Sequence, residues 1–482
     1  MKRFAVRYLL ALSLQGSLLS ALYAQPAAPR TDSVAQLIAG YMKTANWKAV
    51  YALTDSVFRS RVSESMFTAQ MLQLQRTAFG NFIEIRYARR NGNIHYYKSY
   101  FDEAQMLMVL GCTEADSIST LAFRRYFVPG QDTVLRSNNP LRSALDRKVD
   151  SVVRNWLKLS YHAGISIGIY DNGTRMYYGY GETQPGSAQV PGPHSLYEIG
   201  SITKTFTGIL LALQYETGAM HPDTCISYWL PDSLPRMQWN NKPVTATMLS
   251  NHTSGLPSLP LNFKMRKGFD ASNPYKGYTD TLLFSYFTSF KPYREPGKNF
   301  EYSNMGVGLL GLILQRRFNN NYDALVRKYI TGPLNMRQTA QYPQRIRKVN
   351  YTTPHNGTGD VVPHWTFESA FAAAGALHST AADMLTYAAF VMRPASNLLG
   401  AAVKRSVQPT FTIAAGRKIG LGWMLLQSND NEYITHSGGT GGNRSTLLLH
   451  APSGKAVVVL TNTGNEVESI ALQLLNYLTS AN

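Results

Sequence analysis

The chain has 482 residues, of which 44% are hydrophobic and 11% aromatic, so wholesale disorder is excluded and two or three domains are expected. Its 47 Lys and Arg residues outnumber 29 Asp and Glu residues, giving a formal net charge of +18. That charge favours anionic partners such as cell-wall polymers, membrane surfaces or nucleic acid. However, no helix is dense in Lys and Arg, and no zinc-finger spacing is present. We therefore expect no nucleic-acid partner.

The first 24 residues have the pattern of a secretory signal peptide. Three basic residues lie among the first seven, an apolar run follows at 8–14, and Leu22-Tyr23-Ala24 offers a cleavage site. The run is too short to span a membrane, and no later stretch is long enough. Cleavage after Ala24 would remove three basic residues and no acid, leaving a net charge of 18 − 3 = +15. The pattern predicts a protein secreted across the inner membrane into a bacterial periplasm, without stable membrane insertion.

Residues 25–130 are predicted to form a small α+β domain, called the leader domain below. Helical periodicity is present at 34–42 and 63–75. Alternating patterns predict strands at 82–88, 94–101, 105–111 and 117–123, and the first two are joined by an Asn91-Gly92 turn signal. Helices followed by a meander resemble the cystatin- or NTF2-like modules found ahead of hydrolase domains in exported bacterial proteins. No catalytic pattern is present here, so a binding or spacer role is expected.

A polar linker, residues 131–140, is predicted to lead into a second domain at 141–482. This domain begins with an amphipathic helix at 145–156 and a hairpin turning at Asp171-Asn172-Gly173. Its far end has three predicted strands and a helix, at 433–436, 445–450, 456–461 and 467–478. Together the two ends predict one antiparallel sheet flanked by helices. The long, Pro-rich middle region predicts a helical subdomain, with the functional site at the junction.

The first catalytic pattern lies in the stretch Tyr197–Gly208. Ser201 is expected in the first turn of a helix that ends near Gly218, and Lys204 follows one turn later. A serine hydroxyl needs a partner to take its proton, and a buried amine can do so. The helix N-terminus adds a backbone N–H where an oxyanion could form. Alone, this short pattern is more often a capping serine with a solvated lysine.

A second pattern, Glu301-Tyr302-Ser303-Asn304, opens a Gly-rich helix predicted at 305–315. Tyr302 and Asn304 are two residues apart on one loop, so both can face one cleft. Two further loops, 249–257 and 374–383, each contain a histidine among Ser and Thr residues. These histidines, His252 and His378, are expected to be structural turn residues and not catalysts.

A third pattern, His436-Ser437-Gly438-Gly439, ends a predicted strand. The two glycines leave room for a substrate along the strand edge and for the Gly439 N–H to face an oxyanion. Asn443 and Arg444 are candidates for the rim of the cleft. No Cys/His/Asp cluster has metal spacing and no Gly-rich phosphate loop follows a strand, so neither a metal nor another cofactor is expected.

The order Ser-x-x-Lys, Tyr-x-Asn, His-x-Gly resembles the serine β-lactamase and penicillin-binding protein superfamily, in particular its class C-type branch, which includes D-aminopeptidases and esterases. The resemblance covers about residues 141–478 and implies an α+β, β-lactamase/transpeptidase-like domain. It implies that Ser201 is the acylated nucleophile and that Lys204 and Tyr302 share proton transfer. It further implies that Asn304 positions Lys204 and the substrate, and that the N–H groups of Ser201 and Gly439 form the oxyanion hole.

One position departs from the pattern. β-Lactamases of this branch usually have Lys where this chain has His436, and a histidine is mostly neutral at pH 7. The resemblance therefore implies a D-amino-acid peptidase, carboxypeptidase or esterase acting on a small or peptidoglycan-derived substrate, which would lie against Asn304 and His436–Gly439. A true class C-type β-lactamase and a catalytically weak cell-wall-binding protein are the alternatives. The sequence leaves open the oligomeric state and whether Cys112 and Cys225 pair.

Overall fold

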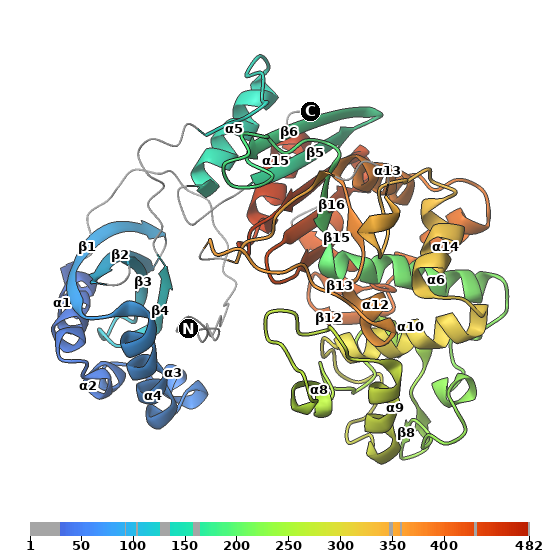
Figure 1. The fold of residues 1–482 in the computed structure, drawn as a ribbon, viewed down its shortest axis with the longest axis horizontal. Helices are drawn as coiled ribbons and strands as arrows, with labels where there is room; N and C mark the ends of the chain where they lie inside the picture. Colours follow the sequence, from blue (N-terminus) through green and yellow to red (C-terminus); the bar gives the residue numbers. More distant parts are fainter. Residues whose placement is uncertain are drawn as a thin grey trace. The chain divides into compact units, whose positions relative to one another are not determined.

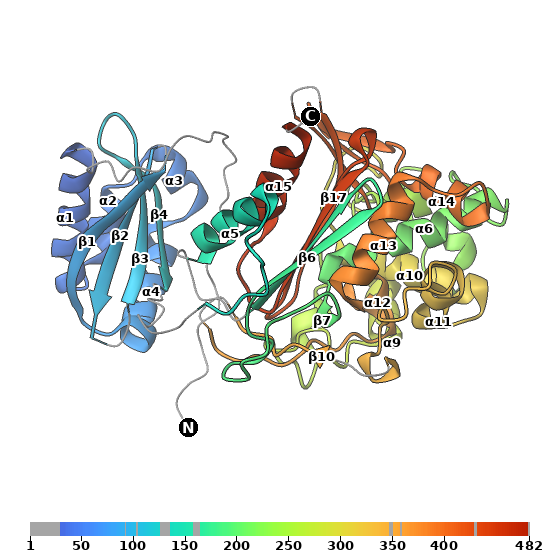
Figure 2. The ribbon, with the colours of Figure 1, turned by 90° about the horizontal axis from the view of Figure 1, so that it is seen from above.

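The structure, a computed structural model, describes residues 29–91, 93–102, 105–125, 135–157, 164–346, 350–356, 359–428 and 431–480. The chain divides into two compact units between residues 132 and 133, and each is described by itself (Figures 1 and 2). The expected signal peptide, Gly92 of the turn signal and part of the linker lie outside the described residues. Within the described residues, no helix is long and apolar enough to cross a membrane.

The first unit packs helices against a four-stranded antiparallel sheet of order β1-β2-β3-β4. Its elements are α1 (Pro29–Lys43), α2 (Trp47–Ala52), α3 (Ser56–Arg61), α4 (Glu64–Leu74), β1 (Phe82–Asn91), β2 (Ile94–Phe101), β3 (Gln105–Cys112) and β4 (Ile118–Arg125). The buried Trp47 meets Phe67 and Phe123 edge-on, which joins α2, α4 and β4 in one core. The prediction of helices followed by a meander is confirmed, whereas α2 and α3 were not predicted. The cystatin- or NTF2-like assignment stays a prediction.

The second unit is built on an eight-stranded antiparallel sheet of order β12-β13-β14-β15-β16-β17-β5-β6. Its strands are β5 (Gly164–Asp171), β6 (Thr174–Gly181), β12 (Phe411–Ala414), β13 (Arg417–Ile419), β14 (Met424–Ser428), β15 (Asn431–Gly439), β16 (Arg444–His450) and β17 (Lys455–Thr461). The pairing of β17 with β5 confirms that the two ends of the domain form one sheet. The short edge strands β12, β13 and β14 were not predicted.

The two faces of this sheet are covered by different helices (Figure 2). Side chains alternate along a strand, so Val457 and Val459 of β17 belong to a core with α5 (Ala144–Leu157) and α15 (Glu468–Ser480). Val458 and Leu460 belong to the opposite core, which includes α13 (Ala381–Met392). Every residue of β17 is buried, as is typical of a central strand.

The helical part of this unit surrounds α6 (Thr203–Glu216), which is buried from Thr203 to Tyr215 (Figure 1). A helix that is apolar on all sides must be enclosed on all sides. Here α6 contacts α10 (Asn304–Phe318), α12 (Ser369–Gly375) and α14 (Leu398–Ser406). The remaining helices are α7 (Ala246–Ser250), α8 (Asn262–Met265), α9 (Asp280–Ser289) and α11 (Tyr322–Val326). The small strands are β7 (Ser195–Glu198), β8 (Gln238–Trp239), β9 (Lys242–Pro243), β10 (Asn350–Tyr351) and β11 (His378–Ser379).

Gly208 permits a close contact between α6 and the segment before β14. A Cβ atom at this position would lie 1.9 Å from the carbonyl oxygen of Leu421. We predict that Gly208→Ala lowers the free energy of unfolding by about 1–3 kcal/mol, because overpacking a buried helix shifts its neighbours. Thermal melting measures this, with Gly192→Ala as the control, since a Cβ there meets nothing within 4 Å. Equal melting temperatures for the two variants would contradict the prediction.

Candidate active site

Ser201 lies in a tight turn between β7 and α6. Residues Gly200–Ile202 form a 3₁₀ turn, and the α-helix begins only at Thr203. The expected first helical turn is therefore a 3₁₀ turn. Gly200 has φ +48°, and a Cβ there would lie 2.7 Å from the backbone nitrogen of Gly439. Glycine is required at this position because the end of β15 touches the turn.

The Lys204 side chain is buried beside Ser201. Its Nζ donates hydrogen bonds to Ser201 Oγ at 2.9 Å and to the Ala374 carbonyl oxygen at 2.6 Å. Lys204 is 1% exposed, and this burial lowers the pKa of the amine well below its ordinary value. Desolvation favours the neutral form, and a neutral amine can accept the serine proton.

Tyr302 completes the contacts of the serine oxygen. Its hydroxyl donates to Ser201 Oγ at 2.8 Å, and Lys204 Nζ lies 4.9 Å from the centroid of its ring. Although 37% of Tyr302 is exposed, desolvation raises the pKa of its hydroxyl, which favours the neutral phenol. The environment thus moves the pKa values of Lys204 and Tyr302 in opposite directions. Opposite shifts of this kind are typical of a pair in which one group can act as a base and the other as an acid.

His252 packs against the Tyr302 ring and bonds to the next residue of the chain. It is a loop residue with φ +62°, and its buried ring lies 4.4 Å from the Tyr302 ring, centroid to centroid. Its Nδ1 accepts a hydrogen bond from the Ser303 N–H at 3.1 Å, and burial lowers the pKa of its imidazole well below the ordinary value. His252 is thus a loop residue that holds the Tyr302 segment. Its contact with Tyr302 was missed, because fifty residues of chain separate the two.

Asn304 begins α10, where Ser303 is the N-cap and accepts from the Gly306 N–H at 2.8 Å. The Asn304 side-chain amide donates to the Tyr275 hydroxyl at 3.2 Å, whereas Lys204 Nζ donates to Ser201 and Ala374, so the role of Asn304 in positioning Lys204 stays a prediction. Tyr275 in turn stacks on Phe367, with ring centroids 4.5 Å apart. Nothing in the sequence around Tyr275 indicated a place beside the site.

The last four residues of β15 lie beside the nucleophile turn. Among the described residues, β14 pairs with β15 only as far as Thr435, so the edge of 436–439 on that side is open. A Cβ at Gly438 would lie 2.0 Å from the Ile199 carbonyl oxygen and 2.9 Å from the Ser201 nitrogen. The glycines therefore allow the backbone of β15 to approach the N–H of Ser201. The Ser437 hydroxyl lies 3.1 Å from that of Thr446 on β16.

His436 is buried and its Nδ1 lies 2.7 Å from the Ser437 carbonyl oxygen. Burial, with a contribution from Lys204, lowers the pKa of His436 to about 3. The imidazole is therefore neutral at pH 7. It does not supply the cation that a lysine would supply at this place.

Of the two residues expected at the rim, one is buried, and a further buried residue was not predicted. Asn443 is fully buried and donates to Glu198, so it does not line a rim. Arg444 donates to the carbonyl oxygens of Thr440 and Asn443, and a Cβ at Gly439 would lie 2.8 Å from its Nη1, so its place at the rim stays a prediction. Glu198 is buried at the end of β7. Its neighbours come from distant segments, so no local pattern identified it. His378 was expected in a turn but lies in strand β11, where it pairs with Glu198 of β7 as part of the scaffold.

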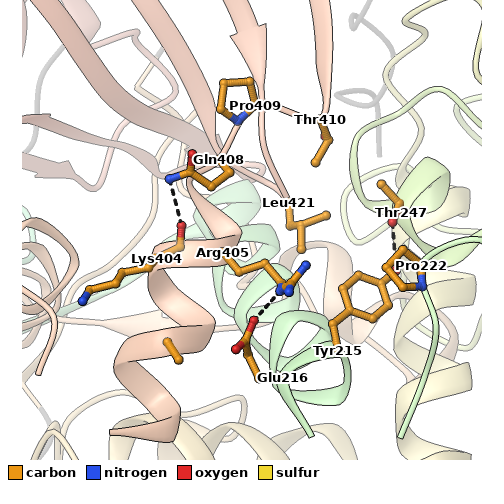
Figure 3. A pocket seen from close by; sticks show the side chains of 11 residues that line it. Tyr215, Glu216, Pro222, Thr247, Lys404, Arg405, Gln408, Pro409, Thr410 and Leu421 are labelled. Atoms are coloured by element: carbon orange, nitrogen blue, oxygen red, sulfur yellow. Dashed lines mark hydrogen bonds and ion pairs between the residues drawn. The ribbon is translucent and has the colours of Figure 1, made fainter. Parts of the chain in front are cut away.

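A separate cavity of about 620 Å³ lies at the other end of α6 (Figure 3). Its lining includes none of the residues predicted for the active site. Its Arg405 pairs with Glu216, and the hydroxyl groups of Tyr215 and Thr247 are 2.9 Å apart. The lining residues are Tyr215, Glu216, Pro222, Thr247, Ala401, Lys404, Arg405, Gln408, Pro409, Thr410 and Leu421. The cavity is therefore not the catalytic site.

Cys112 and Cys225 are both free thiols.

The geometry defines a serine hydrolase site in which a buried lysine and a tyrosine contact the nucleophile. A family model described as Beta-lactamase matches residues 149–477, and the chain belongs to this family. The resemblance to the serine β-lactamase and penicillin-binding protein superfamily is thereby confirmed. The protein is a serine hydrolase of the β-lactamase-related family.

Individual relatives are distant. The chain is 25% identical over 351 residues to Protein flp of Staphylococcus aureus (strain MW2), covering 69% of this chain and 67% of that protein. It is 28% identical over 243 residues to a Beta-lactamase of Providencia stuartii, covering 50% of this chain and 58% of that relative. A β-lactamase/D-alanine carboxypeptidase from Pseudomonas syringae has a TM-score of 0.61 at 20% identity, covering 69% of this chain and 99% of its own. The octameric penicillin-binding protein homologue from Pyrococcus abyssi has a TM-score of 0.61 at 22% identity, covering 69% of this chain and 77% of that chain. Both structures share the fold.

The depressed pKa of His436 predicts a pH-dependent stability. In the unfolded chain His436 takes up a proton below its ordinary pKa of 6.5, whereas in the folded protein it takes up this proton only at about pH 3. The free energy of unfolding should therefore fall as the pH drops through this window, by up to about 1.4 kcal/mol per pH unit from this residue. His436→Gln removes this contribution, so its stability should fall less steeply than that of the wild type.

Urea unfolding at pH 7, 6, 5 and 4 measures the slope. His221→Gln is the control, because His221 is exposed and should leave the slope unchanged. Equal slopes for the wild type and His436→Gln would contradict the prediction.

Proposed function

We propose that this protein is an exported hydrolase that forms an acyl-enzyme on Ser201 and acts as a D-amino-acid peptidase, carboxypeptidase or esterase. The observation that carries the proposal is the pair of hydrogen bonds to Ser201 Oγ, from Lys204 at 2.9 Å and Tyr302 at 2.8 Å. Burial lowers the pKa of Lys204 and raises that of Tyr302, which favours the neutral amine and the neutral phenol that acyl transfer needs.

In the proposed acylation, Ser201 Oγ attacks the substrate carbonyl carbon while its proton passes to the neutral amine of Lys204. The oxyanion lies toward the backbone N–H groups of Ser201 and Gly439. The carbon–nitrogen or carbon–oxygen bond to the leaving group then breaks. The Tyr302 phenol protonates the leaving group, and the ammonium of Lys204 restores the phenol proton. In deacylation, water attacks the carbonyl carbon of the acyl-enzyme and its proton passes to Lys204. The bond to Ser201 Oγ then breaks, Lys204 returns the proton to Ser201, and the acid is released.

The substrate class follows from the charge at His436. A neutral imidazole in place of a lysine reduces the attraction for a substrate carboxylate, which favours esters and D-amino-acid peptides without a carboxylate beside the scissile bond over β-lactams. The mature charge of +15 favours work near an anionic cell wall, and the first 24 residues favour a periplasmic location. We expect a small-molecule or peptidoglycan-derived substrate and neither a nucleic-acid partner nor a cofactor.

A true class C-type β-lactamase is the second candidate, and the relative named Beta-lactamase from Providencia stuartii favours it. A weak cell-wall-binding protein is less well supported. A pure binder has no need for a buried lysine, which costs free energy to desolvate.

Ser201→Ala tests the nucleophile. We predict that wild-type protein, residues 25–482, gains the mass of an acyl group after incubation with a penicillin or a p-nitrophenyl ester, whereas Ser201→Ala does not. Intact-mass spectrometry measures the adduct, and absorbance of the same tube measures hydrolysis.

The outcomes separate the candidates. A persistent penicillin adduct on the wild type alone supports a slowly deacylating peptidase, and consumption of the penicillin supports a β-lactamase. Ester turnover that disappears in Ser201→Ala, with the penicillin untouched, supports an esterase. Activity unchanged by Ser201→Ala on every acyl substrate would refute the proposal.

Tyr302→Phe tests the acid. Removing the hydroxyl leaves the ring against His252 but deletes the proton donor at Ser201, so kcat should fall by about 10²–10⁴-fold with little change in melting temperature. Tyr215→Phe is the matched control, because the Tyr215 hydroxyl is bonded to Thr247 in the separate cavity. Steady-state kinetics of both variants measure the difference. A kcat for Tyr302→Phe close to that of Tyr215→Phe would rule out the acid role.

A further inference from the structure

Glu198 is a buried carboxylate three residues before the nucleophile. It is 2% exposed, and both of its oxygens accept hydrogen bonds. Oε1 accepts from the Trp365 N–H at 2.6 Å. Oε2 accepts from the Thr440 hydroxyl at 2.8 Å and from the Asn443 side-chain amide at 2.6 Å. His364 Nδ1 lies 3.8 Å from the same oxygen. A buried charge with this many donors is fixed in place.

The two partners of Oε2 flank the turn between β15 and β16. Thr440 directly follows Gly439, and Asn443 directly precedes Arg444. The turn is closed by a backbone bond from the Thr440 N–H to the Asn443 carbonyl oxygen at 3.0 Å. Arg444 Nη1 donates to the Thr440 carbonyl oxygen at 2.8 Å. The turn is therefore a rigid unit, and Glu198 holds both of its ends.

Glu198 itself belongs to the segment that carries Ser201. It ends β7, and the 3₁₀ turn with the nucleophile begins two residues later. The Glu198 carboxylate thus connects the segment that contains Ser201 to the turn that follows Gly439. A second hydrogen bond, from the Ser445 hydroxyl to the Ile199 carbonyl oxygen at 2.8 Å, also joins β16 to the Ser201 segment. This bond should keep the two segments in contact when Glu198 is replaced.

We propose that Glu198 is a positioning residue that sets the distance between the Ser201 and Gly439 N–H groups, and so the geometry of the oxyanion hole. This inference rests on the proposed function. The two donors come from segments more than two hundred residues apart, so their spacing depends on contacts between those segments. Oxyanion stabilisation requires donors at a fixed distance from the developing charge, and small displacements reduce the rate.

The test compares kcat, KM and melting temperature for a p-nitrophenyl ester. Glu198→Gln presents an amide N–H₂ to groups that are themselves donors, so at least one bond to the turn is lost. Thr440→Val removes the hydroxyl donor, and Thr440→Ser restores it. We expect kcat to fall about 10- to 100-fold in Glu198→Gln and Thr440→Val, with KM changed less than about 3-fold, and to recover in Thr440→Ser.

Asp146→Asn is the matched control. This buried carboxylate of α5 also accepts three hydrogen bonds, from the N–H groups of Arg142 and Ser143 at 2.9 Å each and from the Tyr178 hydroxyl at 2.8 Å. It belongs to the opposite face of the sheet. Its loss should lower the melting temperature and leave kcat unchanged.

The inference is overturned if Glu198→Gln and Thr440→Val keep kcat within about 2-fold of the wild type. It is also overturned if Asp146→Asn loses kcat to the same extent, since the effect would then be general instability. Absence of any Ser201-dependent turnover in the wild type is a different result. It removes the proposed function, and the inference with it.

Discussion

The burial of the Lys204 amine against Ser201 is the interaction on which the rest of this domain depends. An amine takes the serine proton only when water is excluded from it, because hydration favours the ammonium form. Exclusion requires a helix enclosed on every side, and α6 is buried from Thr203 to Tyr215. The carbonyl of Ala374, from the end of α12, then gives the amine its second hydrogen-bond partner. The helical subdomain thus supplies the buried environment on which the proposed role of Lys204 depends.

The second constraint is the contact between β15 and the nucleophile turn. Gly200 and Gly438 lie so close to the opposite backbone that a Cβ on either would overlap it. A Cβ at Gly438 would also lie 2.6 Å from the Ser445 hydroxyl oxygen of the neighbouring strand β16. The same Ser445 hydroxyl donates to the Ile199 carbonyl oxygen, so the turn lies against the face that β15 and β16 share. The position of the turn relative to β15 therefore depends on the pairing of these two strands.

The sequence predicted what local pattern and motif can carry. Ser201, Lys204 and Tyr302 were identified from short motifs, and the structure brings all three together. Strong alternation and turn signals predicted the sheet formed by both ends of the domain. The short strands β12 to β14 have too few residues to show a period. The places of Tyr275 and Glu198 beside the site, and the contact of His252 with the Tyr302 segment, could not be predicted, because the partners lie between 29 and 245 residues away and only the tertiary fold makes them neighbours.

Because the residue at position 436 is neutral, the lowered pKa of Lys204 must have a cause other than repulsion from a neighbouring cation. A cation beside an amine lowers its pKa by repulsion, and a lysine at 436 would contribute this effect. His436 is neutral at pH 7, and the cause of the depressed Lys204 pKa is desolvation. The packing around α6 is therefore the source of the lowered pKa of Lys204. Loss of packing near Lys204 would admit water and raise the pKa of the amine, so in the proposed mechanism the stability of the helical subdomain and the reactivity of Ser201 would be coupled.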